Sequence, residues 1–242
     1  MKNHDSPETV VHLAGPLTLL STEDTSRAAA QALQFLNFAD ELAHHPFPVA
    51  PGEHRQALLA LIRLCVRHQQ SALLIAPLLG EDDGPDGDPF DSLFFGALDE
   101  EGQNFHDLAQ LVPQNIPVNL SDGLIWTAPW EVERYQRALL RSGPGWYERT
   151  WIQQDDQDGT VYLPWGLYCV GNGNHSAASG ILRGDGHLTP ETTFDLRLVL
   201  ERINLNEHGL IRVDTGALVA TSTDWPVLAL VGLGKRLLDV AP

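Results

Sequence analysis

The chain has 242 residues, 43% of them hydrophobic, which is enough apolar material for one large packed domain or two small ones. It carries 32 acidic against 15 basic residues, a formal net charge of −17, and this balance disfavours a protein that grips duplex DNA by its phosphates. No apolar run reaches the roughly 20 residues that span a bilayer, and the first residues show no apolar signal segment. Because the two cysteines, Cys65 and Cys169, also lie far apart, the sequence predicts a soluble, cytoplasmic protein.

The negative charge is concentrated in residues 68–133, which hold thirteen acids and no Lys or Arg. Two interpretations stay open for this stretch: a solvated surface that keeps the protein soluble, and a docking surface for a basic partner. Within it, residues 81–91 are rich in Asp, Gly and Pro and are typical of an exposed loop. An EF-hand register in this loop would place Gly84 and Leu93 at ligand positions, which argues against calcium.

Helical spacing dominates the first part of the chain. Apolar residues recur every three or four positions between Ser26 and His44, and again from Glu53 until Pro77 stops or kinks the helix. We therefore expect a helical N-terminal region with an acidic loop over residues 1–112, ending at a boundary near residues 113–117.

Residues 113–242 have a different texture, since all six tryptophans lie between Trp126 and Trp225 and strand-like runs alternate with short helices. The pattern predicts a small mixed α/β domain, and the whole chain is therefore expected to be α+β. The expected elements are a strand near 116–120, a helix from Pro129 to Gly143, a β-rich run over 161–170 with Pro164 at an edge or bulge, and a short helix over 177–183. Further strands or helices are expected around a turn at 206–209, before a last helix that begins near Asp224.

The strongest candidate for chemistry is the turn of sequence GNGNHS between the β-rich run and the short helix. The first amides of a helix have no intrahelical acceptor, so such a turn suits phosphate or another anion. Gly171 and Gly173 would let a ligand approach the backbone, and Asn174, His175 and Ser176 would donate hydrogen bonds or shuttle a proton. A structural interpretation also stays open, in which Asn174 caps the helix and His175 satisfies a buried carbonyl.

Other chemistry has weaker support in the sequence. Ser176 and Ser179 lack the Gly-x-Ser-x-Gly context of a serine hydrolase, and no His-x-x-x-His or Cys-x-x-Cys pair suggests zinc, so no metal ligands are assigned. The tryptophans are expected mostly in the core, although Trp165 and Tyr168, just ahead of the glycines, could offer a ring to a nucleotide base.

Two groups of residues are familiar. Leu163-Pro164-Trp165-Gly166 followed by Gly173-Asn174-His175-Ser176, together with Pro129-Trp130-Glu131-x-Glu133-Arg134-Tyr135, resembles an uncharacterised bacterial family classed only as a domain of unknown function. This resemblance covers most of the chain from about Leu33 onward and implies no activity.

The order of strand, helix, strand, turn and helix over residues 116–184 is similar to the nucleotide-binding core of the ParB and sulfiredoxin superfamily. The resemblance implies that Gly173, Asn174, His175 and Ser176 form a phosphate-binding turn. Asn174 stands where ParB-type proteins carry a glutamate and sulfiredoxins a reactive cysteine, so neither chemistry transfers directly. Ser176 replaces the usual arginine, a role that the resemblance leaves to Arg183.

The first functional hypothesis is therefore a protein that binds a nucleotide or phosphate ester at residues 161–183, with hydrolase, transferase and nuclease chemistry all open. A nucleotide, and Mg²⁺ with it, are the cofactors that such chemistry would use. The alternative hypothesis is a non-catalytic immunity or regulatory factor whose acidic region docks on a basic protein partner.

Overall fold

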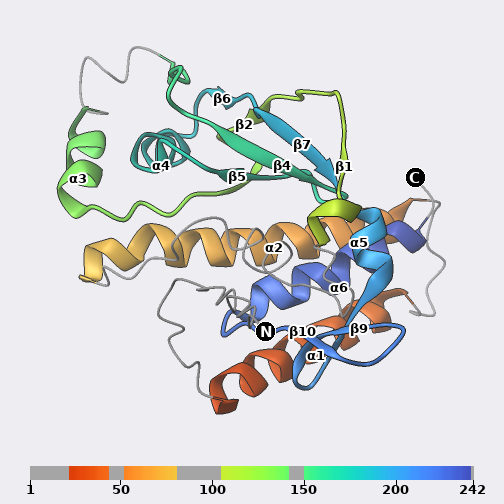
Figure 1. The fold of residues 1–242 in the computed structure, drawn as a ribbon. Coiled ribbons are helices and arrows are strands. Elements are labelled where there is room, and N and C mark those ends of the chain that lie inside the picture. The colour runs from red at the N-terminus through yellow and green to blue at the C-terminus, as the bar shows by residue number, and fades with distance from the viewer. Residues whose placement is uncertain (1–21, 44–51, 81–104, 142–149, 241–242) are drawn as a thin grey trace, which may run out of the picture.

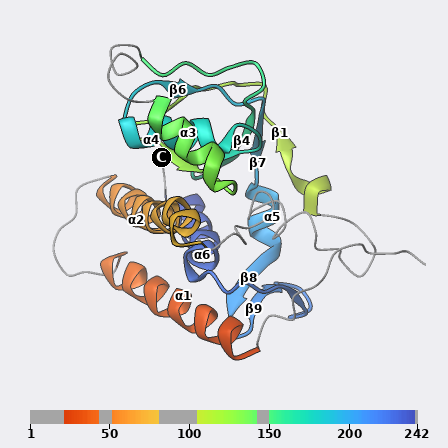
Figure 2. The same cartoon turned by 90° about the vertical axis from the view of Figure 1, so that its left-hand side faces the viewer.

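The computed structural model describes residues 22–43, 52–80, 105–141 and 150–240 (Figure 1). Figures 1 and 2 both show the main sheet with helices α3 and α4 on one side of the molecule, α2 and α6 beneath them, and α1 outermost. Helices come first and sheets follow, so the predicted α+β class is confirmed. The 81–91 loop, most acids of the 68–133 stretch and residues 142–144 lie outside the described residues.

The two helices predicted in the first part of the chain are α1 (Thr22–Ala43) and α2 (Glu53–Ile75). Both bury an apolar stripe, which in α1 is largely alanine and brings the helix close to its neighbours. α2 gives way to the 3-10 turn η1 (Ala76–Leu79) because Pro77 has no amide to continue the α-helical bonding. The stretch Glu53–Leu79 is long and apolar enough to cross a membrane, but half of its most apolar window is buried, and a core helix explains that composition.

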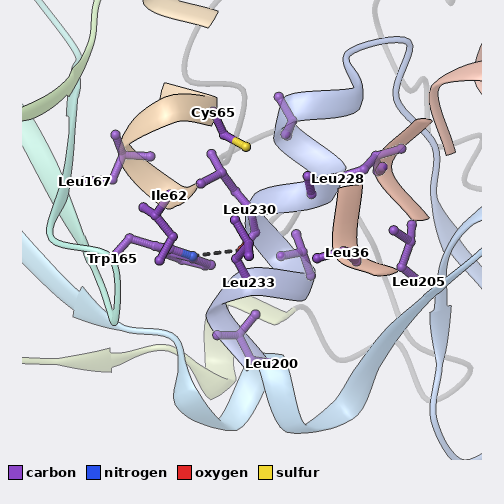
Figure 3. Close-up of a cluster of buried hydrophobic side chains, with 14 of the residues drawn as sticks. Leu36, Ile62, Cys65, Trp165, Leu167, Leu200, Leu205, Leu228, Leu230 and Leu233 are labelled. Atoms are coloured by element: carbon purple, nitrogen blue, oxygen red, sulfur yellow. Dashed lines mark hydrogen bonds between the residues drawn. The ribbon is translucent and has the colours of Figure 1, made fainter. Parts of the chain in front are cut away.

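The last helix, α6 (Trp225–Asp239), joins the two parts of the chain. It is buried without a break from Pro226 to Gly234, as expected of a helix that is apolar on all sides. Asp224 occupies its N-cap position, although the Asp224 side chain makes no capping hydrogen bond. α6 packs against both α1 and α2, so the regions 1–112 and 113–242 share their largest core cluster (Figure 3).

The main sheet has five strands in the order β1-β7-β4-β5-β3. These are β1 (Gln110–Leu111), β7 (Thr192–Asp195), β4 (Gly159–Leu163), β5 (Leu167–Val170) and β3 (Leu124–Trp126). The pairs β4–β7 and β3–β5 are parallel, whereas β4–β5 and β1–β7 are antiparallel. The carboxyl ends of the two parallel pairs therefore point in opposite directions along the strands. One candidate site lies at each of these two ends of the sheet.

Residues 161–170 are β-rich as predicted, but they form a hairpin of two strands, so the expectation that Pro164 marks an edge or bulge is wrong. Pro164, Trp165 and Gly166 form the turn between β4 and β5, and Gly166 has the positive φ of 69° that such a tight turn needs. Pro164 follows a cis peptide bond. The proline thus ends one strand instead of marking a bulge within it.

The helix predicted from Pro129 begins later, as α3 (Val132–Arg141). The amides of Ala128 and Glu131 donate to side chains of α4, which fixes residues 128–131 ahead of the helix. α3 then packs on α4 (Asn174–Arg183) through the buried ring of Tyr135.

The remaining elements complete the fold around α5 (Arg197–Arg202). β8 (Ile203–Asn206), β9 (Gly209–Arg212) and β10 (Leu218–Ala220) form an antiparallel sheet in the order β10-β9-β8. The predicted turn at 206–209 connects β8 and β9. β2 (Val118–Asn119) pairs with β6 (His187–Leu188), and η3 (Phe105–Leu108) precedes β1.

Candidate functional site

The glycine turn leads directly into α4, which begins at Asn174 and not at the predicted residue 177. Gly173 is the N-cap residue and has φ 83°, a conformation that suits glycine, and Gly184 ends the helix as predicted. Asn174, His175 and Ser176 therefore lie in the first helical turn. The helix geometry leaves the amides of these three residues without intrahelical acceptors.

The Asn174 side chain connects the helix to the end of β3. Its Oδ1 accepts hydrogen bonds from the Thr127 hydroxyl at 2.7 Å and from the Ala128 amide at 3.0 Å. Thr127 is only 2% exposed, so this amide oxygen satisfies donors that water reaches poorly. Asn174 thus tethers the start of α4 to the segment that follows β3, and its side chain does not cap its own helix.

The His175 side chain makes a second tether. Its Nε2 accepts a hydrogen bond from the Glu131 amide at 3.0 Å, which requires that nitrogen to be unprotonated. Burial lowers the pKa of His175 below its ordinary value, and the nearby Arg134 cation lowers it further against the pull of the Glu131 carboxylate. The imidazole also makes an edge contact with the Trp130 ring, with ring centroids 5.5 Å apart. The Arg134 guanidinium lies over the same Trp130 ring.

Ser176 makes the third tether, to Trp151. The indole Nε1 of Trp151 donates to both the Ser176 carbonyl at 3.0 Å and the Ser176 hydroxyl at 3.2 Å. The three polar side chains predicted to meet a ligand therefore hold two preceding segments against α4, namely residues 127–131 and Trp151. These hydrogen bonds account for the polar triplet without a ligand.

The surroundings of the glycines are acidic. The Asp158 carbonyl accepts the Gly171 amide at 3.0 Å, and a β-carbon added at Gly171 would lie 2.5 Å from the Asp158 carboxylate. The Asn172 side chain donates to the carbonyl of Asp156. A phosphate placed on this turn would therefore meet a carboxylate at close range, which is unfavourable.

The structure does not bring Trp165 and Arg183 to the helix start. Trp165 lies on the β4–β5 turn, at the other end of β5, where it is 3% exposed and donates from Nε1 to the Leu230 carbonyl at 2.8 Å (Figure 3). Arg183 is the last residue of α4, about 14 Å along the axis from Asn174, and pairs with Asp185 at 2.9 Å. Tyr168 is fully buried, and burial raises the pKa of its hydroxyl.

A second site, at the carboxyl ends of β4 and β7, is hollow and cationic. Leu163 and Asp195 are register partners at the ends of these parallel strands, so the residues that follow them leave the sheet at the same end. A cavity of ≈530 Å³ opens there between α2, α5 and α6. We call it the cationic cavity; its lining includes Arg55, Pro164, Arg197, Glu201, Lys235 and Asp239.

The two arginines of the cationic cavity are available to a ligand. Neither Arg55 nor Arg197 makes an ion pair with any residue in the described ranges, whereas five other arginines do. Lys235 donates to the Ile203 carbonyl, and burial lowers its pKa, an effect that Asp239 opposes. Three of the chain's 15 basic residues thus share one hollow in a protein of net charge −17.

In the part of the chain that the structure describes, no metal site or nucleophile stands out beside these groups. Among the described residues, no three His, Cys, Asp or Glu side chains come together as metal ligands. Burial raises the pKa of the Cys65 thiol to about 12, so this cysteine stays protonated and unreactive at neutral pH.

The cationic cavity was missed in the sequence because its three cations come from three distant helices. Two signals pointed toward it. The first is that basic residues are scarce in this chain, so each one is a candidate for binding an anion. The second is the Leu163-Pro164-Trp165-Gly166 motif, which supplies Pro164 to the cavity wall.

Comparison with known proteins identifies one family, and its function is unknown. The model of a family of unknown function, DUF6710, matches residues 21–240. No curated protein and no solved structure shows a significant match. Since the match covers nearly all of the chain, including the glycine turn and the cationic cavity, the protein belongs to the family DUF6710.

Proposed function

We propose that the protein binds a small phosphate ester, a nucleotide among them, in the cationic cavity. The observation that carries the proposal is a pair of arginines, Arg55 and Arg197, that line one hollow of ≈530 Å³ and make no ion pair with a described residue. A guanidinium offers donors in a fixed fork that matches a phosphate group, and a cavity of this size is typical of small-molecule sites.

The acids in the cavity wall narrow the ligand class. Glu201 lies one helical turn after Arg197, and Asp239 one turn after Lys235, so the cavity combines cations with hydrogen-bond acceptors. A bare anion would use only the cations. An ester of phosphate with a hydroxylated skeleton, such as ribose, would satisfy both, because its hydroxyls donate to the carboxylates.

The proposal is one of binding and not of a defined reaction. None of the described residues that line the cationic cavity is Ser, Cys or His, the side chains that most often attack or transfer a proton. A cytoplasmic location belongs to the same proposal, since phosphorylated metabolites of this kind are abundant there.

Ligand-induced stabilisation tests the proposal. AMP, ribose 5-phosphate and inorganic phosphate are titrated while the melting temperature is recorded. At about 100 times the dissociation constant, AMP should stabilise the fold by about 2.7 kcal/mol, which corresponds to a rise of about 5 to 10 °C. The rise for inorganic phosphate should be smaller.

Matched variants locate the site. Arg55→Gln should abolish most of the AMP-induced rise, whereas Arg63→Gln, an exposed arginine two turns further along α2, should retain it. The proposal fails if no phosphate ester shifts the wild type, or if Arg55→Gln responds as the wild type does. A shift lost in His175→Ala but kept in Arg55→Gln would place the ligand on the glycine turn instead.

That last outcome would favour the ParB and sulfiredoxin likeness, which remains a finer proposal about the fold. It is supported by the parallel β3–β5 pair, with α3 between its strands in the sequence and α4 following the turn. It needs a phosphate on the glycine turn, where the Asp158 carboxylate lies close to Gly171, so we rank it second.

The alternative of a docking protein for a basic partner is supported by the charge of −17 and the acids of residues 68–133. It predicts that phosphate esters leave the melting temperature unchanged.

A further inference from the structure

The cationic cavity contains a residue type that is rare in this chain. Of the 15 basic residues, 13 are arginines and 2 are lysines. Lys235, in α6, is the only lysine in the described ranges, and it lines the cationic cavity together with Arg55 and Arg197. A guanidinium stays protonated in proteins, whereas an amine can lose its proton and act as a nucleophile. Lys235 is therefore the basic group of this cavity that can bond covalently to a ligand.

The surroundings of Lys235 position its amine and favour the unprotonated form. Nζ donates to the carbonyl of Ile203, which directly follows α5, and α5 contributes Arg197 and Glu201 to the cavity wall. This hydrogen bond is only partly buried, so the amine is open to a ligand. Burial lowers the pKa of the Lys235 ammonium group, an effect that Asp239 opposes. A neutral amine still carries two hydrogens, so it can keep the bond to Ile203 while its lone pair is free to attack.

We propose that the phosphate ester bound in the cationic cavity also carries an aldehyde group, with which Lys235 forms an imine while the two arginines hold the phosphate. This inference rests on the proposed function, because it adds a carbonyl group to the same ligand. The ammonium first gives one proton to water. The nitrogen lone pair then attacks the aldehyde carbon, a C=N bond replaces the C=O bond, and the two remaining amine hydrogens leave with the oxygen as water. The open-chain form of a sugar phosphate carries both groups.

Trapping with sodium borohydride tests this, because the reagent reduces an imine to a stable secondary amine that peptide mass spectrometry locates. The full chain is treated with pyridoxal 5′-phosphate and, in parallel, with pyridoxal, which lacks the phosphate. The labelling of Lys235 is divided by that of Lys2, the other lysine of the chain, which removes the difference in intrinsic reactivity between the two aldehydes. This ratio should be about tenfold higher with pyridoxal 5′-phosphate, the value of a hydrogen bond to a charged group.

Matched variants assign the phosphate contact. Arg197→Gln, which changes an exposed side chain, should lower the ratio toward the value for pyridoxal, whereas Arg63→Gln should keep it. The inference is overturned, and the proposed function stands, if AMP raises the melting temperature but the ratio is the same for both aldehydes. If AMP has no effect and the ratio is also the same, both fail. A wild-type ratio in Arg197→Gln also overturns the inference, because the phosphate would then lie elsewhere.

Discussion

At the residue scale, the three polar side chains of the glycine turn act as tethers, and Asn174 makes the most consequential one. Asn174→Ala would leave the Ala128 amide without its acceptor and weaken the bonding of the buried Thr127 hydroxyl. We expect a loss of about 1 to 3 kcal/mol, or roughly 2 to 10 °C in melting temperature. Asn174→Asp keeps an acceptor oxygen at the start of a helix and should stay close to wild type. An unchanged melting temperature in Asn174→Ala would contradict the tether.

His175 makes the stability of the fold depend on pH. Its pKa in the folded chain is lowered, so the unfolded chain binds the proton more readily between the two pKa values. The contribution of His175 is therefore complete above about pH 6.5, the pKa of the unfolded chain, and is lost as the pH falls through the lower folded value.

Melting temperatures measured from pH 7.5 down to pH 5 should consequently fall further for the wild type than for His175→Gln. His208→Gln, which alters an exposed histidine beside Glu207, should follow the wild type. Parallel curves for wild type and His175→Gln would mean that the imidazole does not change protonation on unfolding.

At the element scale, two glycines of α6 allow the helix to pack closely against large side chains. A β-carbon at Gly234 would lie 2.5 Å from Cζ2 of Trp165, and one at Gly232 would lie 2.3 Å from Leu36. Trp165 cannot move away easily, because it is buried and bonded to the Leu230 carbonyl. Close contact between α6, the β4–β5 turn and α1 therefore depends on glycine.

Gly234→Ala should destabilise the fold by about 1 to 3 kcal/mol, even though alanine is the better helix former by about 1 kcal/mol. Chemical denaturation of Gly234→Ala, Trp165→Phe and the double variant forms a cycle. The double variant should lose less than the sum of the single losses, because the smaller ring makes room for the methyl group. Additive losses would show that the clash is not with Trp165.

The elements differed in how far their own sequence determined them. α1 and α2 were predicted because their apolar stripes repeat at helical spacing within one segment. The β4–β5 hairpin was missed, since a short apolar run containing Pro164 gives no period that separates one strand from two. The start of α3 was misplaced because the amides before it bond to α4, more than 40 residues away in the chain. The polar triplet was found, but its partners Thr127, Glu131 and Trp151 are tertiary contacts that no local pattern records.

At the scale of the whole molecule, acidic charge exceeds what ion pairs can neutralise. Even if all 15 basic residues were paired, 17 of the 32 acids would remain unpaired. The described arginine pairs are mostly at the surface, where each contributes little. Repulsion among the remaining acids should therefore outweigh the pairs, and it should weaken the folded state at low ionic strength.

Sodium chloride should consequently raise the melting temperature. An increase from about 0.01 M to about 0.15 M shortens the screening length from about 30 Å to about 8 Å, which weakens repulsion over distances comparable with a domain. Replacing Asp82, Asp83 and Asp86 by Asn makes the net charge less negative, from −17 to −14. The triple variant should show a smaller salt effect, and its free energy of unfolding should change by no more than about 0.5 kcal/mol. Differential scanning calorimetry of both proteins across the salt series measures the two slopes. A melting temperature that falls with salt would show that ion pairs dominate, and a loss of several degrees in the triple variant would mean that these carboxylates hold a cation or cap buried structure.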